Sequence, residues 1–147
     1  MIKLGSIITI ILLLIVAIVE FGVDQKTPNH LIAEKHIGKC EAIEFLKEEV
    51  FQSSNQTTIF FKCKGVQGPI EVLFIISNNE IEKLLILKSN EGIDKLALNN
   101  TEFLKAFQQN MLDLPIDVDA VSGATISSQI IIDEMNKHVK EWNKKDD

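Results

Sequence analysis

The sequence predicts an α+β fold, in which a small antiparallel sheet with flanking helices is tethered by one N-terminal transmembrane helix. Two β-rich runs, residues 70–77 and 81–88, flank the pair Asn78-Asn79, and Asn tolerates the positive φ that a hairpin turn demands. Apolar residues recur at helical spacing over residues 127–142. An uncharged N-terminal stretch precedes these elements. The 147 residues leave room for one domain and an appendage.

The N-terminal stretch predicts a membrane anchor at residues 1–23. Residues 4–19 carry no charge, and a spanning helix needs about 20 mostly apolar residues whereas a signal-peptide core has roughly 7 to 15. Because no convincing small-x-small cleavage site follows, we expect an uncleaved anchor; a cleaved signal and a buried globular helix are the alternatives. Lys3 precedes the stretch and Glu20 follows it. The positive-inside tendency therefore predicts a single-pass protein of the cell membrane, with a cytoplasmic N-terminus and an extracytoplasmic domain.

A polar linker at residues 24–29 separates the anchor from a domain at residues 30–143, and the charged residues 144–147 form a polar tail. Asn29 predicts the N-cap of a short helix, because its side chain can accept a hydrogen bond from a first-turn amide. Gly38 predicts the end of that helix, since glycine tolerates the backbone angles of a C-cap.

The next segments predict β-structure with different clarity. Residues 40–50 suit a strand and a helix about equally, whereas residues 57–63 are β-branched and aromatic and predict a strand. The polar residues 52–56 predict a turn between them. Loops at residues 65–69 and 89–92 then bracket the Asn-Asn hairpin.

Two helices are predicted in the second half of the chain. The first covers residues 101–109, with Asn100 or Thr101 as its cap. Its inward-facing residues are expected to be Phe103, Leu104 and Phe107. The second is the last helix, whose apolar face is expected to carry Ile130, Ile131, Met135, His138, Val139 and Trp142.

The two cysteines, Cys40 and Cys63, fit no metal-binding spacing. The favoured interpretation is two free thiols packed as small apolar side chains. A disulfide stays open, because oxidising surroundings outside the membrane permit one and a hairpin of residues 40–50 with 57–63 would bring the pair close together.

Charge and histidine placement exclude several functions. Acidic residues outnumber basic ones, and 15 − 21 gives a net charge of −6. No Lys/Arg cluster compensates, so no nucleic-acid binding is expected. His30, His36 and His138 are not paired by spacing with a nucleophile, so we expect packing or surface roles for them. We predict no catalytic residue and no metal site.

A phosphate site is predicted at residues 119–125, Asp-Ala-Val-Ser-Gly-Ala-Thr, which lead directly into the last helix. At such a place free backbone N–H groups and the positive end of the helix dipole face the ligand. Gly123 permits unusual backbone angles, and Ala124 keeps the approach free of bulk. The hydroxyls that can donate to phosphate oxygens, or be esterified themselves, belong to Thr125, Ser127 and Ser128.

Two further readings attach to this loop. Asp119 is an acid six residues upstream of Thr125, available as a metal or hydroxyl partner while a phosphate is transferred. An ordinary capped turn, with Ser127 or Ser128 as the N-cap, is the alternative that the residues alone allow.

The loop also resembles the flavinylation motif of the FMN-binding domain family, an Asp, two variable residues, Ser or Thr, and then Gly-Ala-Thr. Asp119, Ser122 and Thr125 stand at fixed positions of that motif. The resemblance covers about residues 60–142. Residues 65–70 are similar to the Gly-x-Gly-Gly-Pro-Ile turn of the family. The pair Glu-Gly at 91–92 falls where the family often has Glu-Thr-Pro-Gly, here without Thr-Pro.

The resemblance implies that FMN is attached through a phosphoester to the Thr125 hydroxyl. A flavin transferase would move it from FAD, with Mg²⁺ present during the transfer and absent afterwards. The resemblance and the loop chemistry together make the other candidate cofactor-binding residues Asp119, Ser122, Gly123, Ala124, Ser127, Ser128 and Glu91.

With one anchor, the layout is similar to the G subunit of Rnf-type ferredoxin:NAD oxidoreductases and the C subunit of sodium-pumping NADH:quinone oxidoreductases. This implies a membrane-anchored electron carrier that works with other subunits of an ion-translocating oxidoreductase and is not an enzyme on its own. The alternatives are a stand-alone extracytoplasmic flavoprotein, an accessory domain that holds FMN loosely or not at all, and a hydrolase or adhesin-like surface domain.

Overall fold

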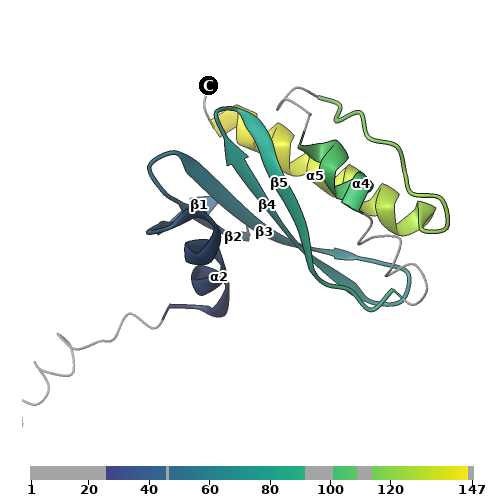
Figure 1. Ribbon diagram of the computed structural model, residues 1–147, viewed down its shortest axis with the longest axis horizontal. Helices are drawn as coiled ribbons and strands as arrows, with labels where there is room; N and C mark the ends of the chain where they lie inside the picture. Colours follow the sequence, from purple (N-terminus) through teal and green to yellow (C-terminus); the bar gives the residue numbers. More distant parts are fainter. Residues whose placement is uncertain (1–25, 46, 92–100, 109–113, 146–147) are drawn as a thin grey trace, which may run out of the picture.

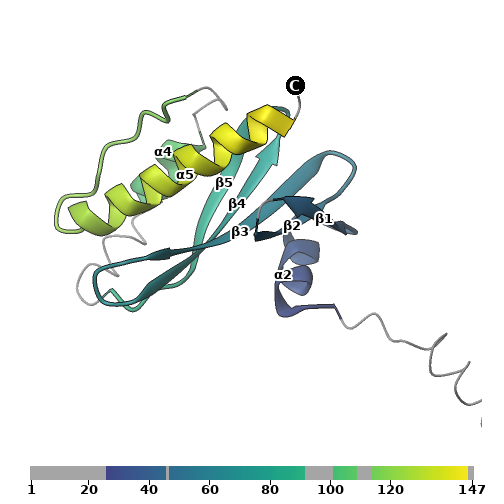
Figure 2. The same ribbon diagram turned by 180° about the vertical axis from the view of Figure 1, so that it is seen from behind.

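A five-stranded antiparallel sheet lies between helix α2 on one face and helices α4 and α5 on the other (Figures 1 and 2). The computed structural model describes residues 26–45, 47–91, 101–108 and 114–145, so the predicted anchor lies outside it. The strands are β1 (Glu41–Phe45), β2 (Glu48–Gln52), β3 (Gln56–Lys64), β4 (Pro69–Ser77) and β5 (Glu80–Lys88), and the helices are α2 (Pro28–Ile37), α4 (Thr101–Phe107) and α5 (Thr125–Lys145).

The strands follow one another in the sheet in chain order, so each neighbouring pair is a hairpin. This architecture confirms the predicted α+β fold. Among the helices of the described ranges, none is both long and apolar enough to cross a membrane.

The N-cap of helix α2 lies two residues earlier in the chain than predicted. Thr27 is its N-cap, and the Thr27 Oγ1 accepts a hydrogen bond of 3.2 Å from His30 N. Pro28 occupies the first helical position, where a missing N–H costs no hydrogen bond. The predicted cap at Asn29 is therefore wrong, because the proline displaces the cap to the residue before it. The predicted end is confirmed by Gly38, at φ 73°.

The ambiguous residues 40–50 form β1 and the start of β2. The reason for the ambiguity lies in the two-sided burial of this hairpin. Phe45 and Val50 pack in the cluster under α5, whereas Phe51 packs in the cluster under α2. Adjacent apolar residues that serve opposite faces of a sheet give no clean alternation, so the period-2 pattern of a half-buried strand is absent.

The central hairpin of β4 and β5 confirms the prediction from its turn. Asn78 and Asn79 have φ of 52° and 62°, the left-handed angles that a two-residue hairpin loop requires. Strand β4 is buried almost throughout because both faces of the sheet are covered at its centre. Ile70, Val72 and similar residues face α5, while Leu73 and Ile75 face α2.

The two cysteines lie on opposite faces of the sheet. Cys40 belongs to the cluster under α2 and Cys63 to the cluster under α5, and both are buried free thiols. Burial raises the pKa of the Cys63 thiol to about 11 and also raises that of Cys40. The interpretation as packed free thiols is therefore confirmed.

We predict that both thiols resist alkylation in the folded protein at about pH 8, because a buried thiol with a raised pKa offers little of the reactive thiolate. Mass spectrometry after iodoacetamide treatment should find no adduct on the native protein and two adducts after denaturation without reductant. Two cysteines that become alkylated only after reductant is added would contradict this placement.

Helix α5 packs across the sheet through one face. Its buried residues include the predicted Ile131, Met135, His138, Val139 and Trp142. His138 is only 2 % exposed, and its ring stacks on Phe61 with centroids 4.7 Å apart. The His138 Nε2 lies 3.2 Å from Glu48 Oε1. This contact joins the middle of α5 to β2. His138 therefore packs against the apolar core through its ring and also makes a polar contact with a strand of the sheet.

Replacing His138 by Ala should lower the free energy of unfolding by about 2–4 kcal/mol, because it leaves a cavity beside Phe61 and removes the partner of Glu48. Urea denaturation measures the change. Lys137→Ala is the matched control, since Lys137 is exposed and makes only a surface ion pair with Glu134, so its effect should stay within about 0.5 kcal/mol. Equal effects of the two variants would contradict the packing role of His138.

Candidate functional site

The segment that carries the predicted phosphate loop runs back alongside α5 to the start of the helix (Figures 1 and 2). Two hydrogen bonds hold it there. Ile116 N donates to Asn136 Oδ1 at 2.7 Å, and Val121 N donates to Ser128 Oγ at 2.9 Å. The segment is therefore held along the helix at two points. The first is in the middle of α5, at Asn136, and the second is in its first turn, at Ser128.

A tight turn then leads into α5. Ala124 N donates to Val121 O at 3.0 Å, and Gly123 has φ of 87°, which favours glycine. The Ala124 side chain is buried in the cluster under α5. Helix α5 begins at Thr125, so Ser127 and Ser128 lie inside its first turn. The alternative that made one of them the N-cap is wrong, because the helix already begins two residues before Ser127.

The three hydroxyls that lie close together in the sequence differ in burial and in hydrogen bonding. The Ser128 hydroxyl is buried, accepts from Val121 N and donates to Ala124 O at 2.8 Å. The Ser127 hydroxyl is buried and donates to Glu91 Oε2 at 2.7 Å. Thr125 is exposed, and its Oγ1 makes only a long contact of 3.4 Å to Val121 O. Of the three, Thr125 alone presents a hydroxyl to solvent.

The amides of the first turn complete the anion-binding geometry. No acceptor for the N–H groups of Thr125, Ile126 and Ser127 lies within the described part of the chain. These are the groups that a helix start leaves without an intrahelical partner, and they carry the positive end of the helix dipole. Ser122 and Asp119 are exposed beside this start. Neither makes a hydrogen bond or ion pair with another described residue, so the proposed assistance of Asp119 has no contact behind it in this structure.

Glu91 occupies a different position from the other candidates. Its side chain is completely buried, and its carboxylate accepts from Ser127 Oγ and from Gln67 N. It therefore lies beneath the first turn of α5, not on the exposed side where Thr125 lies. The sequence pointed to Glu91 only through the resemblance of residues 91–92 to the Glu-Thr-Pro-Gly segment of the FMN-binding domain family. It missed Gln67, because a backbone donor leaves no signal in residue type.

Two exposed apolar side chains flank this region. Ile126, next to Thr125, is 65 % exposed, and Val66, in the turn between β3 and β4, is 59 % exposed. The Glu91 bridge joins the two segments that carry them, since it binds Gln67 on one side and Ser127 on the other. Exposed apolar side chains beside a free hydroxyl suit a ligand with a polar end and a planar apolar body.

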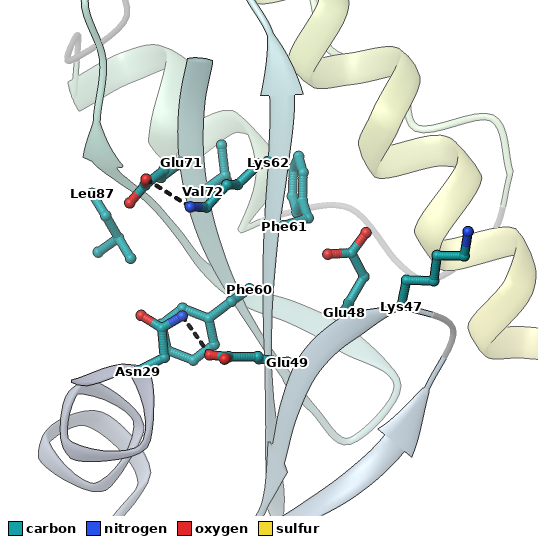
Figure 3. A pocket seen from close by; sticks show the side chains of 10 residues that line it. All are labelled: Asn29, Lys47, Glu48, Glu49, Phe60, Phe61, Lys62, Glu71, Val72 and Leu87. Carbon is teal, nitrogen blue, oxygen red and sulfur yellow. Dashed lines mark hydrogen bonds and ion pairs between the residues drawn. The ribbon is translucent and has the colours of Figure 1, made fainter. Parts of the chain in front are cut away.

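A hollow of about 370 Å³ lies elsewhere, along the sheet where β2 diverges from β3 (Figure 3). Phe60 and Leu87 contribute apolar surface, and the Lys62–Glu71 ion pair, 3.0 Å long, lies on one side of it. No residue of the 119–125 loop or of the first turn of α5 lines it. The hollow is therefore separate from the predicted phosphate site.

Fold and site together define an α+β domain that offers the exposed Thr125 hydroxyl and unpaired first-turn amides at a helix start, which is the arrangement of an anion-binding domain. The family model of the FMN-binding domain matches residues 65–140, from the turn after β3 to late in α5. The chain therefore belongs to the FMN-binding domain family, as the motif predicted. A search of curated proteins found no relative of the chain.

Because Ser128 is buried and hydrogen-bonded while Thr125 is exposed, we expect substitutions at the two positions to have different effects on stability. Ser128→Ala should lower the free energy of unfolding by about 1–3 kcal/mol, because it leaves the Val121 N–H without its acceptor. Thr125→Ala should change it by no more than about 0.5 kcal/mol, since the Thr125 side chain is exposed and weakly bonded. Chemical denaturation of the two variants beside the wild type decides this. A larger loss at Thr125 than at Ser128 would contradict the assignment.

Proposed function

We propose that this protein is an electron carrier that holds FMN covalently, through a phosphoester to the Thr125 hydroxyl. The observation that carries the proposal is the contrast at the start of α5, where Thr125 is exposed while Ser127 and Ser128 are buried and bonded. Membership in the FMN-binding domain family supports FMN as the group that is held.

The residues present fit a flavin phosphate. The free amides of Thr125, Ile126 and Ser127 would donate to its oxygens, and the positive φ of Gly123 shapes the turn beside them. Ile126 and Val66 would offer apolar contact to the flavin ring. When bound, FMN supplies the capacity to accept and release one or two electrons, while the protein supplies position and electrostatics.

In the proposed attachment the Thr125 hydroxyl is the nucleophile that this chain supplies. Thr125 Oγ1 attacks the phosphorus of the FMN half of FAD, so that an Oγ1–P bond forms and the pyrophosphate P–O bond breaks. AMP leaves, and the hydroxyl proton passes to solvent; no electron changes hands in this step. A separate flavin transferase, with Mg²⁺, would catalyse it. Asp119, the first residue of the loop, is the acid nearest to Thr125 in the sequence, so it is the residue to which we assign hydroxyl or metal contact during the transfer.

The cellular setting is part of the same proposal. Residues 1–23 would anchor the protein in the cell membrane with the flavin domain outside, on the strength of their uncharged composition. A covalent link suits that location, because FMN lost outside the membrane could not readily be replaced. We propose that the protein passes electrons between neighbouring subunits of an Rnf- or Nqr-type ion-translocating oxidoreductase.

The attachment is tested by producing the full chain together with a flavin transferase. We expect a band that fluoresces after denaturing electrophoresis and an intact mass raised by one FMN less one water. Thr125→Ala should abolish both signals, because no other exposed hydroxyl in the first turn can replace Oγ1. Thr125→Ser should retain them, since it keeps a hydroxyl at the same place.

Ser54→Ala serves as the control, because Ser54 carries an exposed hydroxyl in the turn between β2 and β3, outside the loop and α5, and this variant should remain flavinylated. A dark wild-type band with the mass of the bare polypeptide, obtained with an active transferase, would overturn the covalent link. Flavin that copurifies but is lost on denaturation would instead identify the accessory domain that binds FMN loosely.

A further inference from the structure

The carboxylate of Glu91 forms a bridge between two parts of the chain that are far apart in sequence. Its Oε1 accepts from Gln67 N at 3.0 Å, in the turn between β3 and β4. Its Oε2 accepts from Ser127 Oγ at 2.7 Å, in the first turn of α5. Glu91 itself follows the end of β5, so three elements meet at one buried side chain.

Gly65 is the residue that makes room for this bridge. A Cβ built on Gly65 would lie 2.1 Å from Glu91 Oε1, and 2.9 Å from both Glu91 Cδ and the backbone carbonyl oxygen of Gly68. Such distances are far below any contact distance between these atoms, so a side chain at this position would displace the carboxylate. Gly65 does not have a positive φ. The glycine is therefore required by the close approach of the Glu91 carboxylate and the Gly68 carbonyl oxygen, and not by its own backbone conformation.

The bridge also determines what Ser127 can do. Both Ser127 and Glu91 are completely buried, and the Ser127 hydroxyl proton is directed to the carboxylate. That proton is therefore withheld from a ligand on the exposed side of α5. A buried carboxylate is also stabilised next to a helix start, where the dipole favours negative charge. The pairing leaves Thr125 as the exposed hydroxyl of the turn.

We propose that Glu91 is a positioning residue for flavin attachment. Its carboxylate holds the first turn of α5 against the Gly65–Gly68 turn and keeps Ser127 turned inward, so that the Thr125 hydroxyl and the neighbouring amides keep one arrangement. The inference rests on the proposed attachment of FMN at Thr125. It assigns to Glu91 a role beneath the site, in place of the direct cofactor contact that the resemblance of residues 91–92 to the family segment implied.

The test measures the rate at which a flavin transferase loads FMN onto the full chain, with each variant shown to be folded by circular dichroism. Glu91→Ala should lower the rate at least about tenfold, since a small misplacement of a reacting group has effects of that size. Gly65→Ala should also lower the rate while Glu91 itself is unchanged, because the new methyl group would meet both the carboxylate and the Gly68 carbonyl oxygen and so disturb the bridge from the side of the turn. The double variant should lose little more than either alone, since both break one bridge.

Glu91→Gln separates positioning from charge. Its amide oxygen can still accept from Gln67 N, and its NH₂ group can donate to Ser127 Oγ, so the geometry survives with one hydrogen bond reversed. We expect its loading rate to stay within about threefold of the wild type. Phe51→Ala is the control for general destabilisation, because Phe51 is buried in the cluster under α2, on the opposite face of the sheet. It should load at the wild-type rate while folded.

The outcomes are separable. If the wild type takes up no flavin, the proposed function fails before Glu91 is in question. If the wild type loads and Glu91→Ala and Gly65→Ala load as fast as Phe51→Ala, the positioning role is overturned. Slow loading of Glu91→Gln as well as Glu91→Ala would also overturn it, because the carboxylate charge and not its position would then be responsible.

Discussion

The packing of α5 across one face of the sheet is the interaction on which the rest of the structure depends. Its buried residues, from Ile131 to Trp142, close the larger of the two apolar clusters. The helix is about 30 Å long at 1.5 Å per residue, so its two ends lie in different parts of the molecule. The far end packs Trp142 against Phe45 of β1, and the near end presents Thr125. Because one rigid element carries both, the apolar core fixes where the candidate site lies.

Polar groups at the near end of α5 obey the rule that buried donors and acceptors find partners. Ser128 satisfies the Val121 amide and so attaches the incoming loop to the helix. Ser127 satisfies one oxygen of Glu91, whose other oxygen satisfies the amide of Gln67. Both serine hydroxyls are therefore hydrogen-bonded to buried groups of the protein. The first-turn amides and the Thr125 hydroxyl stay available outside, which is the physical basis for assigning attachment to Thr125.

The proposed carrier needs no enclosed pocket, because a covalent link replaces the affinity that a pocket would otherwise provide. Binding through contacts alone must offset the loss of translational and rotational freedom, whereas a phosphoester removes that cost after attachment. This agrees with the open surface around Thr125 and the exposed Ile126 beside it. The hollow in Figure 3 shares no residue with the site, so its size carries no weight in the assignment.

The sequence by itself determined the elements whose signals are local. The Asn78-Asn79 turn, the strand after residue 56, the apolar face of α5 and the Ser-Gly-Ala-Thr motif all depend on neighbours within a few positions. Tertiary structure decided the features that depend on contacts between residues distant in the sequence. Residues 40–50 became two strands because opposite faces of the sheet bury adjacent side chains. Of three equivalent hydroxyls, that of Ser128 is bonded within the incoming loop, and that of Ser127 is turned inward because Glu91, 36 positions earlier, reaches the helix start. Partners so distant in sequence meet only when the sheet and α5 have packed.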